Sequence, residues 1–496
     1  MKTTPHPALS PEGRGTRGGA VATIRDLCFT PAGELARLYR ARKVSPLDVM
    51  QVLLERIDLV NPRVNAIVTL DRDGALWQAR RATAALKRGA TLGPLHGIPV
   101  GIKDVTATKG IRTTYGSKLF EQHVPDEDAV VVERLKAAGA IILGKTNTPE
   151  FAFGPNTTNA VFGATRNPWN LALTSGGSSG GSAVALATGM CPLAEGTDLG
   201  GSLRGPAAYC GVVGFRTTPG LVPRYPDVLG WDSYSVEGPM ARTISDTALM
   251  LSVMSGAADD RAPMSYESDP RALLAAVRRP TVKGWRVAWT PDLGGLLTVD
   301  PEIASLCEES AGVFAKLGAR VQRASPDMSD VPEIVRLSRG FLMVARHADK
   351  LDQWKEQLQS GLVENTVQGL ALSARDIARG ELLRTQLWHR VRAFLDTHDL
   401  WLTPTTATPP FPIELPHAVE VGGQPLGKTM QRSYLTYAFS LLGLPAISIP
   451  CGFTKAGLPV GLQIVGRRRG ESAVLSAAAA FETARPWADY IPPVVQ

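Results

Sequence analysis

Cysteine is scarce in this chain of 496 residues, which contains 5 cysteines, far apart and odd in number. None lies in a CxxC motif or beside a histidine, so neither a disulfide framework nor a structural zinc site is indicated. A reducing cytoplasm is the compartment that fits such cysteine usage. The five are Cys28, Cys191, Cys210, Cys307 and Cys451.

Long uninterrupted apolar runs are also missing. The first 20 residues contain no apolar segment, so no secretory signal is predicted. The most apolar window, Tyr434–Phe453, is interrupted by Gly443, Pro445 and Pro450. Proline and glycine break a spanning helix, so we do not expect a membrane protein.

The excess of one charge is small, with 53 Lys and Arg against 46 Asp and Glu. The basic residues are scattered, and the one dense run, Arg467–Arg469, is typical of a solvated face rather than a nucleic-acid site. The seven histidines lack HxxxH or HExxH spacing, which disfavours a metal hydrolase. We expect no cofactor, no metal, no nucleic acid and no membrane partner, and a monomer or homodimer acting on a small molecule.

Apolar residues make up 44% of the chain, which is ordinary for an enzyme with a large core. Helical patterns alternate with short apolar strands, and this order predicts an α/β fold. Residues 1–22 are rich in Pro, Gly, Ser, Thr and Arg and are predicted to be a disordered tail. A length of 496 residues favours two or three domains, but the family resemblance described below implies that residues 23–496 form one domain. Within it, a mainly helical region, about 301–395, is expected to help cover the active site.

The clearest helix start is Ser45-Pro46, with Ser as N-cap and Pro at the first helical position, and Asn61-Pro62 is predicted to stop this helix. The polar segment 258–285 is predicted to be a surface excursion. Further helices are predicted at Ala75–Lys87, Ala129–Ala138, Gly181–Thr188 and Thr243–Ser255, and strands at Val100–Ile102, Ala140–Leu143, Leu400–Thr403 and Ala446–Pro450.

The most informative stretch is Gly176–Gly214, GGSSGGSAVALATGMCPLAEGTDLGGSLRGPAAYCGVVG. It holds two serine sites set in glycine, Ser178–Ser179 and Ser202. Glycine allows close approach and positive φ, which suits a serine nucleophile beside free backbone N–H groups. A flexible Gly/Ser linker is the alternative, but the apolar residues between the two sites argue against it.

Two other motifs suggest different chemistry. Gly176–Gly180 matches the GxSxG elbow of α/β-hydrolases, and histidines follow at His347, His389, His398 and His417. That elbow requires a preceding strand, and Asn170–Ser175 is a poor one. Gly139–Thr146 matches a Walker A string, but its inner residues Ala140–Leu143 are typical of a strand rather than a phosphate-binding loop.

Several blocks together resemble the amidase signature family. Gly176–Ala183 and Gly196–Ala207 match its GGSSGGSA and GTDxGGSxRxPA motifs, with 24 residues from Ser178 to Ser202, and Gly97–Asp104 matches its GIPxxxKD segment. The resemblance runs from about Ser45 to about Gly466. Further matching blocks are Gly144–Asn147, Arg166–Asn170, Glu237–Arg242 and Gly443–Ala446.

The resemblance implies a fold and a set of roles. The fold is α/β, the amidase signature fold, with a central mixed twisted β-sheet covered by helices on both faces. Ser202 would be the nucleophile, and Ser178, often preceded by a cis peptide bond, would lie between it and Lys103. Lys103 must be neutral to act as a base, so burial must lower its pKa from the usual ~10.4. The neighbouring Asp104 would raise that pKa if it pointed toward Lys103.

The same resemblance assigns supporting residues. Asp198 and Arg204 would pair to hold the loop, and His96 is interpreted as structural or pocket-lining. The oxyanion hole would be built from the backbone N–H groups of Leu199, Gly200, Gly201 and Ser202. The side chains of Phe151, Phe153 and Trp231 would line an apolar acyl pocket or belong to the core.

The chain departs from the family pattern at Gly205, where a branched apolar residue is common, and at Leu199, where Thr or Ile is frequent. The function this implies is a serine amidase that cleaves the C–N bond of uncharged amides, with anilides, esters and carbamates as further candidates. One alternative is an amidotransferase A-type subunit that acts with partner subunits on acyl-tRNA. A binding protein with a decayed site is disfavoured by the intact Lys103, Ser178 and Ser202.

Overall fold

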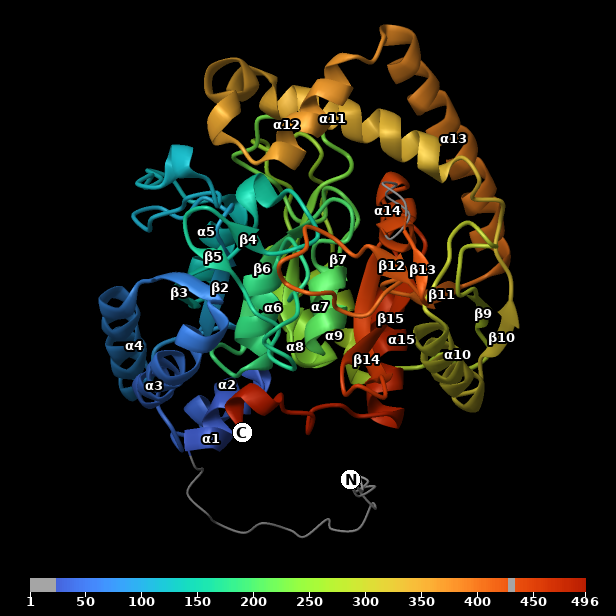
Figure 1. The fold of residues 1–496 in the computed structure, drawn as a ribbon. Coiled ribbons are helices and arrows are strands. Elements are labelled where there is room, and N and C mark those ends of the chain that lie inside the picture. Colours follow the sequence, from blue (N-terminus) through green and yellow to red (C-terminus); the bar gives the residue numbers. More distant parts are fainter. Residues whose placement is uncertain (1–23, 427–432) are drawn as a thin grey trace, which may run out of the picture.

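The computed structural model describes residues 24–426 and 433–496, so the predicted tail, 1–22, lies outside the described residues. An 11-stranded sheet crosses the molecule (Figure 1). Its strands, in spatial order, are β1 (Ile67–Leu70), β3 (Ile141–Thr146), β2 (Pro99–Lys103), β6 (Leu193–Asp198), β8 (Val236–Ala241), β7 (Val213–Arg216), β14 (Ala446–Phe453), β15 (Pro459–Val465), β11 (Leu400–Pro404), β9 (Arg286–Trp289) and β10 (Arg320–Arg323).

The sheet is mixed, as predicted. Strand β2 runs parallel to both of its neighbours, β3 and β6. The pairs from β6 through β8, β7, β14 and β15 to β11 are antiparallel, and β9 pairs parallel with β10 and β11. Because β2 and β6 lie side by side, the ends of these two strands bring Lys103 and Asp198 to one edge of the sheet.

Apolar side chains on both faces of the sheet are covered by helices. Ile447 and Ile449 of β14 belong to one core cluster, whereas Ala446 belongs to another. Successive side chains of a strand point to opposite faces, so this alternation shows a sheet buried on both sides. On one face pack α2 (Ala32–Arg40), α5 (Val130–Ala137), α8 (Ile244–Met254), α9 (Pro270–Arg278), α10 (Pro301–Lys316) and α15 (Glu471–Ala484); on the other lie α6 (Gly180–Ala187), α7 (Arg204–Cys210) and α14 (Tyr434–Leu441).

Helix α3 (Pro46–Val64) begins as predicted. The Ser45 side chain accepts from the Asp48 N–H, and the Asp48 carboxylate accepts from the Ser45 N–H, which is a capping box. The predicted end is wrong, because the helix runs through Pro62 to Val64. Pro62 has no N–H to donate, so the last turn of the helix lacks one hydrogen bond but continues. The residue after the helix, Asn65, is its C-cap and has φ 53°.

The segment 258–285 lies mostly at the surface, as predicted, and it contains the helix α9. The N-cap of this helix, Asp269, accepts from the Arg271 N–H, Pro270 is the first residue, and Leu273 is buried in the main core. The Asp-Pro pair is a helix-start signal, but it precedes only one fully buried residue, so the apolar pattern is weak. The smaller elements are α1 (Ile24–Phe29), α4 (Arg72–Lys87) and the strand pairs β4 (Thr158–Asn159)–β5 (Gly163–Ala164) and β12 (Glu420–Val421)–β13 (Gln424–Pro425).

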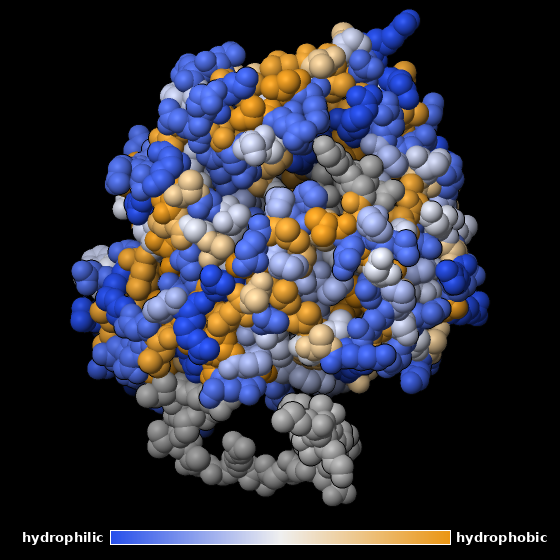
Figure 2. Space-filling view, in the orientation of Figure 1, coloured by the Kyte–Doolittle hydropathy of each residue, from blue (hydrophilic) through white to orange (hydrophobic). Residues whose placement is uncertain are grey.

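The predicted helical region, about 301–395, divides into two parts. In the first part, helix α10 packs on the sheet, and strand β10 forms one edge of that sheet. Three helices, α11 (Val331–Trp354), α12 (Ser360–Leu370) and α13 (Ala374–Thr397), form a layer at the top of Figure 1 that we call the cap. Figure 2 shows hydrophobic residues along the top of this face, over the cap helices, where Phe341, Val367, Leu370 and Leu382 are exposed.

The five cysteines are buried thiols, and the Sγ atoms of Cys307 and Cys451 lie 3.8 Å apart. Across residues 24–426 and 433–496, no helix combines the length and the apolar character needed to cross a membrane.

Candidate active site

Lys103 lies at the end of β2 and is fully buried. Its Nζ atom is 2.6 Å from Ser178 Oγ, 2.9 Å from Ser179 Oγ and 2.8 Å from Thr197 Oγ1. All three partners are hydroxyl groups, and none is a carboxylate. Ser178 and Ser179 come from the glycine-rich loop before α6, and Thr197 comes from β6, so three separate segments surround the amine.

Burial lowers the pKa of Lys103 to about 7, against the opposing charges of Glu195 and Asp198. A neutral amine has two N–H donors and one lone pair. Ser179 donates its hydroxyl proton to Thr197 O at 3.3 Å, so it accepts from Lys103. The lone pair is then free for the shortest contact, where it can accept a proton from Ser178. The geometry therefore suits a base that acts on the Ser178 hydroxyl.

The loop that carries Ser178 depends on its glycines. The Gly177–Ser178 peptide bond is cis, and Gly176 has φ 79°. A Cβ on Gly177 would lie 2.7 Å from Gly154 O, and a Cβ on Gly181 would lie 2.2 Å from Asn147 N. Such distances are incompatible with any side chain, so these glycines allow the loop and the start of α6 to pack against neighbouring backbone.

Ser202 lies in the turn between β6 and α7. Its carbonyl accepts from the Ser179 N–H at 3.1 Å, which ties it to the residue that follows Ser178. Its neighbours Gly201 and Leu203 are buried, whereas Ser202 is partly exposed. The other partly exposed residues between 193 and 204 are Thr197, Leu199 and Gly200. A ligand can therefore reach this turn at Ser202.

Three of the four predicted oxyanion donors are available. The backbone N–H groups of Leu199, Gly200 and Ser202 find no acceptor among the described residues. The prediction is wrong for Gly201, because its N–H donates to Asp198 Oδ1 at 2.9 Å. A contact with helix α14 also fixes this turn, because Thr436 Oγ1 donates to Gly200 O at 2.7 Å.

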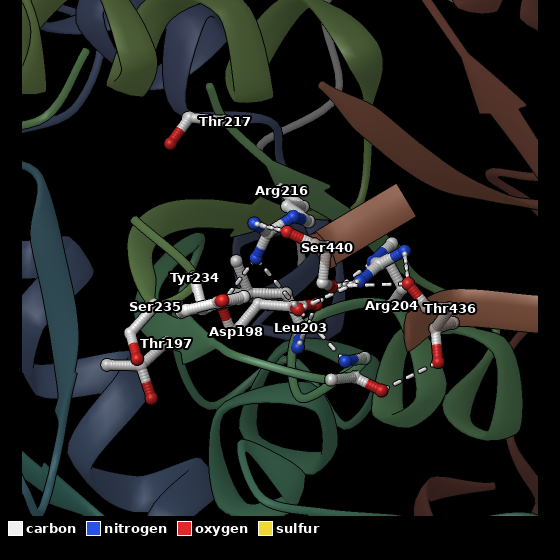
Figure 3. Close-up of polar contacts among 12 residues, drawn as sticks. Thr197, Asp198, Leu203, Arg204, Arg216, Thr217, Tyr234, Ser235, Thr436 and Ser440 are labelled. Carbon is white, nitrogen blue, oxygen red and sulfur yellow. Dashed lines mark hydrogen bonds and ion pairs between the residues drawn. The ribbon is translucent and has the colours of Figure 1, made fainter. Parts of the chain in front are cut away.

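The expected pair of Asp198 and Arg204 is present and fully buried (Figure 3). Arg204 Nε and Nη2 donate to the two carboxylate oxygens at 3.0 and 2.9 Å. Sequence reasoning missed Arg216 of β7, which donates to Asp198 O at 2.6 Å. Burial opposes ionisation, but the two guanidinium groups hold the pKa of Asp198 well below its usual range. Arg204 also donates to Thr436 O, Gln463 Oε1 and Ser440 Oγ.

Asp104 points away from the site, which resolves the question left by the sequence. Its carboxylate accepts from the Thr114 N–H and hydroxyl. Its charge raises the pKa of a second buried lysine, Lys145, although burial still lowers that pKa to about 8. Among the carboxylates, Glu195 raises the pKa of Lys103 the most. Its carboxylate accepts the Lys103 backbone N–H at 3.0 Å. Glu195 was not identified from the sequence.

The predicted substrate-contacting residues separate into two groups. Phe151 and Phe153 are partly buried and pack, with Leu199, against the apolar cluster to which the cap contributes. Trp231 is 74% exposed and belongs to none of the apolar clusters of the described residues, so the structure does not support it as a pocket wall. His96 contacts Ala82 O at 3.0 Å, which agrees with a structural role.

Neither alternative motif has the required context. Residues 170–175, which precede Gly176, form turns and isolated bridges rather than a strand. Most of the Walker-like string lies inside β3, and Lys145 donates to Thr108 Oγ1 at 2.8 Å. Within the described part of the chain, no group of three or more His, Cys, Asp or Glu could hold a metal ion.

The chain is similar to known proteins of one family over most of its length. A family model described as Amidase matches residues 48–475. An acylamidase from Rhodococcus erythropolis is 38% identical over 95% of this chain and 98% of its own length. The A-type subunit of a glutamyl-tRNA(Gln) amidotransferase from Moorella thermoacetica is 34% identical over 92% and 97%. The crystal structure of a bacterial aryl acylamidase of the amidase signature family has a TM-score of 0.86 and 30% identity, covering 94% of this chain and 98% of that one.

The fold and the buried lysine among serines thus define one class, and the chain belongs to the amidase signature family. It is an amide-hydrolysing enzyme with the amidase signature fold.

Proposed function

We propose that this enzyme hydrolyses small acyl amides, anilides among them, through an acyl-enzyme on Ser202. Ser178 relays protons, and neutral Lys103 is the base. The observation that carries the proposal is the 2.6 Å contact between Lys103 Nζ and Ser178 Oγ, in a site where burial lowers the pKa of Lys103 to about 7. A lysine with its ordinary pKa would be protonated at neutral pH and could not accept a proton.

The first half-reaction forms the acyl-enzyme. Ser202 Oγ attacks the amide carbonyl carbon, its proton passes to Ser178 Oγ, and the proton of Ser178 passes to Lys103 Nζ. The negative oxygen that develops is stabilised by the free N–H groups of Leu199 and Gly200. Collapse of this intermediate breaks the C–N bond, and the proton held by Lys103 returns through Ser178 to the leaving amine.

The second half-reaction releases the acid. A water molecule attacks the acyl carbon, its proton follows the same route to Lys103, and the Ser202 oxygen leaves and recovers a proton. The Asp198–Arg204–Arg216 cluster contacts no reacting atom in this scheme. Its role is to fix the turn, because Asp198 accepts from the N–H groups of Gly201 and Leu203, on both sides of Ser202.

Two substrate classes follow from the relatives. The acylamidase and the aryl acylamidase support small amides and anilides. Esters and carbamates, including urethanes, fit the same chemistry, because an alcohol leaving group can also take a proton from Ser178. The amidotransferase relatives support the alternative, in which the chain releases ammonia for a tRNA-linked reaction together with partner subunits.

A single experiment separates these candidates. The purified chain alone is assayed on p-nitroacetanilide and on a p-nitrophenyl ester, without glutamine, ATP or tRNA, with Ser202→Ala as the matched control. We expect hydrolysis by the wild type and none above background by the variant. Activity that requires amidotransferase partner subunits would instead establish the alternative.

A further inference from the structure

Arg339 of the cap is a partly buried cation without a counter-charge. Its Nε donates to Asn365 Oδ1 at 2.8 Å, and its Nη1 donates to the Tyr437 hydroxyl at 2.7 Å. Its guanidinium carbon lies 4.7 Å from the centre of the Phe153 ring. It forms no ion pair with any carboxylate among residues 24–426 and 433–496. Both hydrogen-bond partners are neutral, so the positive charge is not compensated.

Several other arginines of the cap helices each form an ion pair with a carboxylate, which compensates their positive charge. Arg336, one turn before Arg339, pairs with Glu333 at 2.8 Å, and Arg390 pairs with Asp330 at 2.6 Å. Arg346 pairs with both Asp227 and Asp232. Burying a cation away from water is costly unless an anion accompanies it. Arg375 also lacks an ion pair with a described carboxylate, but it is exposed to water, so it is the partly buried Arg339 that requires an explanation.

Arg339 lies between the two loops that carry the reaction centre. On one side, the Tyr437 ring packs on the oxyanion turn so closely that a Cβ on Gly200 would lie 2.2 Å from it. On the other side, Phe153 precedes Gly154, whose carbonyl packs against Gly177, the residue before Ser178. The Tyr437 side chain separates the guanidinium from the oxyanion turn, and the Phe153 ring together with the Gly154 backbone separates it from the serine loop.

The surroundings contain charges of both signs, because the buried Glu150 carboxylate, which accepts from the Ser117 hydroxyl and the Gln359 N–H, belongs to the residue before Phe151, and a second cation lies over the Phe151 ring. Lys350, on the same helix as Arg339, lies with Nζ 5.6 Å from the centre of the Phe151 ring and makes no ion pair with a described carboxylate. Phe151 and Phe153 supply apolar surface next to the two cations. Nε and one N–H of Nη1 of Arg339 are engaged, but Nη2 has no acceptor among the described residues, so the outer end of the guanidinium, Nη1 and Nη2, can still bind a planar carboxylate by two parallel hydrogen bonds.

We propose that Arg339 binds a carboxylate of the substrate, so that the enzyme prefers amides that carry a carboxylate near the cleaved bond. This inference rests on the proposed function and adds a carboxylate to the small amide substrate proposed there. The carboxylate can stand on the acyl side or on the amine side of the amide, and both sources are tested separately. Arg339 is then a specificity-determining residue.

Binding to the Ser202→Ala variant tests the inference without turnover. Two matched pairs are titrated by calorimetry: N-glutaryl against N-pentanoyl p-nitroanilide, and 4-acetamidobenzoate against acetanilide. We expect the carboxylated member of one pair to bind at least about tenfold more tightly, a difference of about 1.4 kcal/mol. Adding Arg339→Met to the Ser202→Ala variant should abolish this preference for the carboxylated compound. Adding Arg336→Met, which changes an exposed arginine on the same helix, should leave the preference unchanged.

Equal affinity within both pairs would overturn the inference, and so would a ratio that survives Arg339→Met. If Arg339→Met fails to fold, Arg339→Lys keeps a charge but loses the fork, and a reduced ratio there supports the same conclusion. Should the wild type hydrolyse none of the four compounds while Ser202→Ala shows the preference, the proposed function fails and the anion site stands.

Discussion

At the scale of single residues, the two buried lysines show how position decides chemistry. Lys145 donates to the carbonyl of Thr106 and the hydroxyl of Thr108, and burial lowers its pKa while the nearby Asp104 acts to raise it. Lys103 has only hydroxyl partners at its amine, and two of them belong to the serine loop. A proton taken by Lys103 can therefore come from Ser178, whereas Lys145 has no acidic hydroxyl that leads toward Ser202.

The pH dependence of activity follows from Lys103. Its pKa is lowered to about 7, and only the neutral form accepts a proton. Activity should therefore be lost as the pH falls below about 7 and reach a plateau above about 8, and the profile of kcat/KM against pH measures this. Lys103→Met should lower kcat by about 10²–10⁴-fold, the usual contribution of a general base. A flat profile between pH 5 and pH 9, with chemistry rate-limiting, would contradict a lysine base.

Glu195 should tune that profile. Its charge raises the pKa of Lys103, and a glutamine can still accept the Lys103 backbone N–H. In Glu195→Gln the acid limb of the kcat/KM profile should move to lower pH. The exposed Glu34→Gln is the control and should leave the limb in place. A limb that moves to higher pH in Glu195→Gln would show that the carboxylate does not act through its charge.

Ser202 should carry the acyl group. Ser202→Ala should lower kcat by about 10⁵–10⁶-fold, as for other serine nucleophiles, with an unchanged melting temperature. A sulfonyl fluoride should label Ser202, as read by mass spectrometry of peptides. Label on Ser178 instead would reverse the roles of the two serines.

The sequence predicted candidate residues that lie in matching family motifs, and it did not indicate residues outside those motifs. Lys103, Ser178 and Ser202 were found because the blocks that contain them match a known spacing. Glu195 lies two residues before Thr197 in the same strand, and nothing in its sequence context shows that β2 would pair beside it. Arg339 has no motif, and its significance appears only when Tyr437 and Phe153 are in place.

At the scale of elements, close helix contacts are set by glycine. In the cap, α11 and α12 meet at Gly340 and Gly369, where a Cβ on Gly369 would lie 2.4 Å from Gly340 O. The sequence predicted the helical content of this region, because the apolar spacing is strong. It did not separate α10 from the cap, since both have helical periodicity and only burial against the sheet distinguishes them.

Substitution of Gly369 tests the cap as a unit. Gly369→Leu should force α11 and α12 apart and destabilise the enzyme by at least about 1–3 kcal/mol, as overpacking does. Because α11 carries Arg339, affinity for carboxylated amides should fall as well. The control is Gly312→Ala in α10, where a Cβ meets nothing within 4 Å, and it should stabilise by about 0.5–1 kcal/mol. Thermal unfolding measures the stability of both variants. A melting temperature that Gly369→Leu leaves unchanged would contradict the close packing of α11 on α12.

At the scale of the whole molecule, the turn that contains Val494 packs against the helix α3. Figure 1 shows the C-terminus beside α1 and α2. Val494 is buried in the cluster formed by α3 and the small-residue helix α6, and Arg63 Nη1 donates to its carbonyl at 2.8 Å. No local pattern predicted this contact, because five apolar or proline residues, Ile491–Val495, do not specify a partner more than 400 positions away.

Val494→Asp against Gln496→Asp tests this closure with the same new charge at a buried and an exposed position. The buried substitution loses about 1.5–3 kcal/mol of apolar burial and also desolvates a carboxylate unless the terminal turn detaches. The melting temperature should therefore fall by several degrees for Val494→Asp and by less than about one degree for Gln496→Asp. Activity at low temperature should persist in both variants, because neither residue contacts Lys103, Ser178 or Ser202. Equal melting temperatures would show that the terminal turn adds nothing to stability.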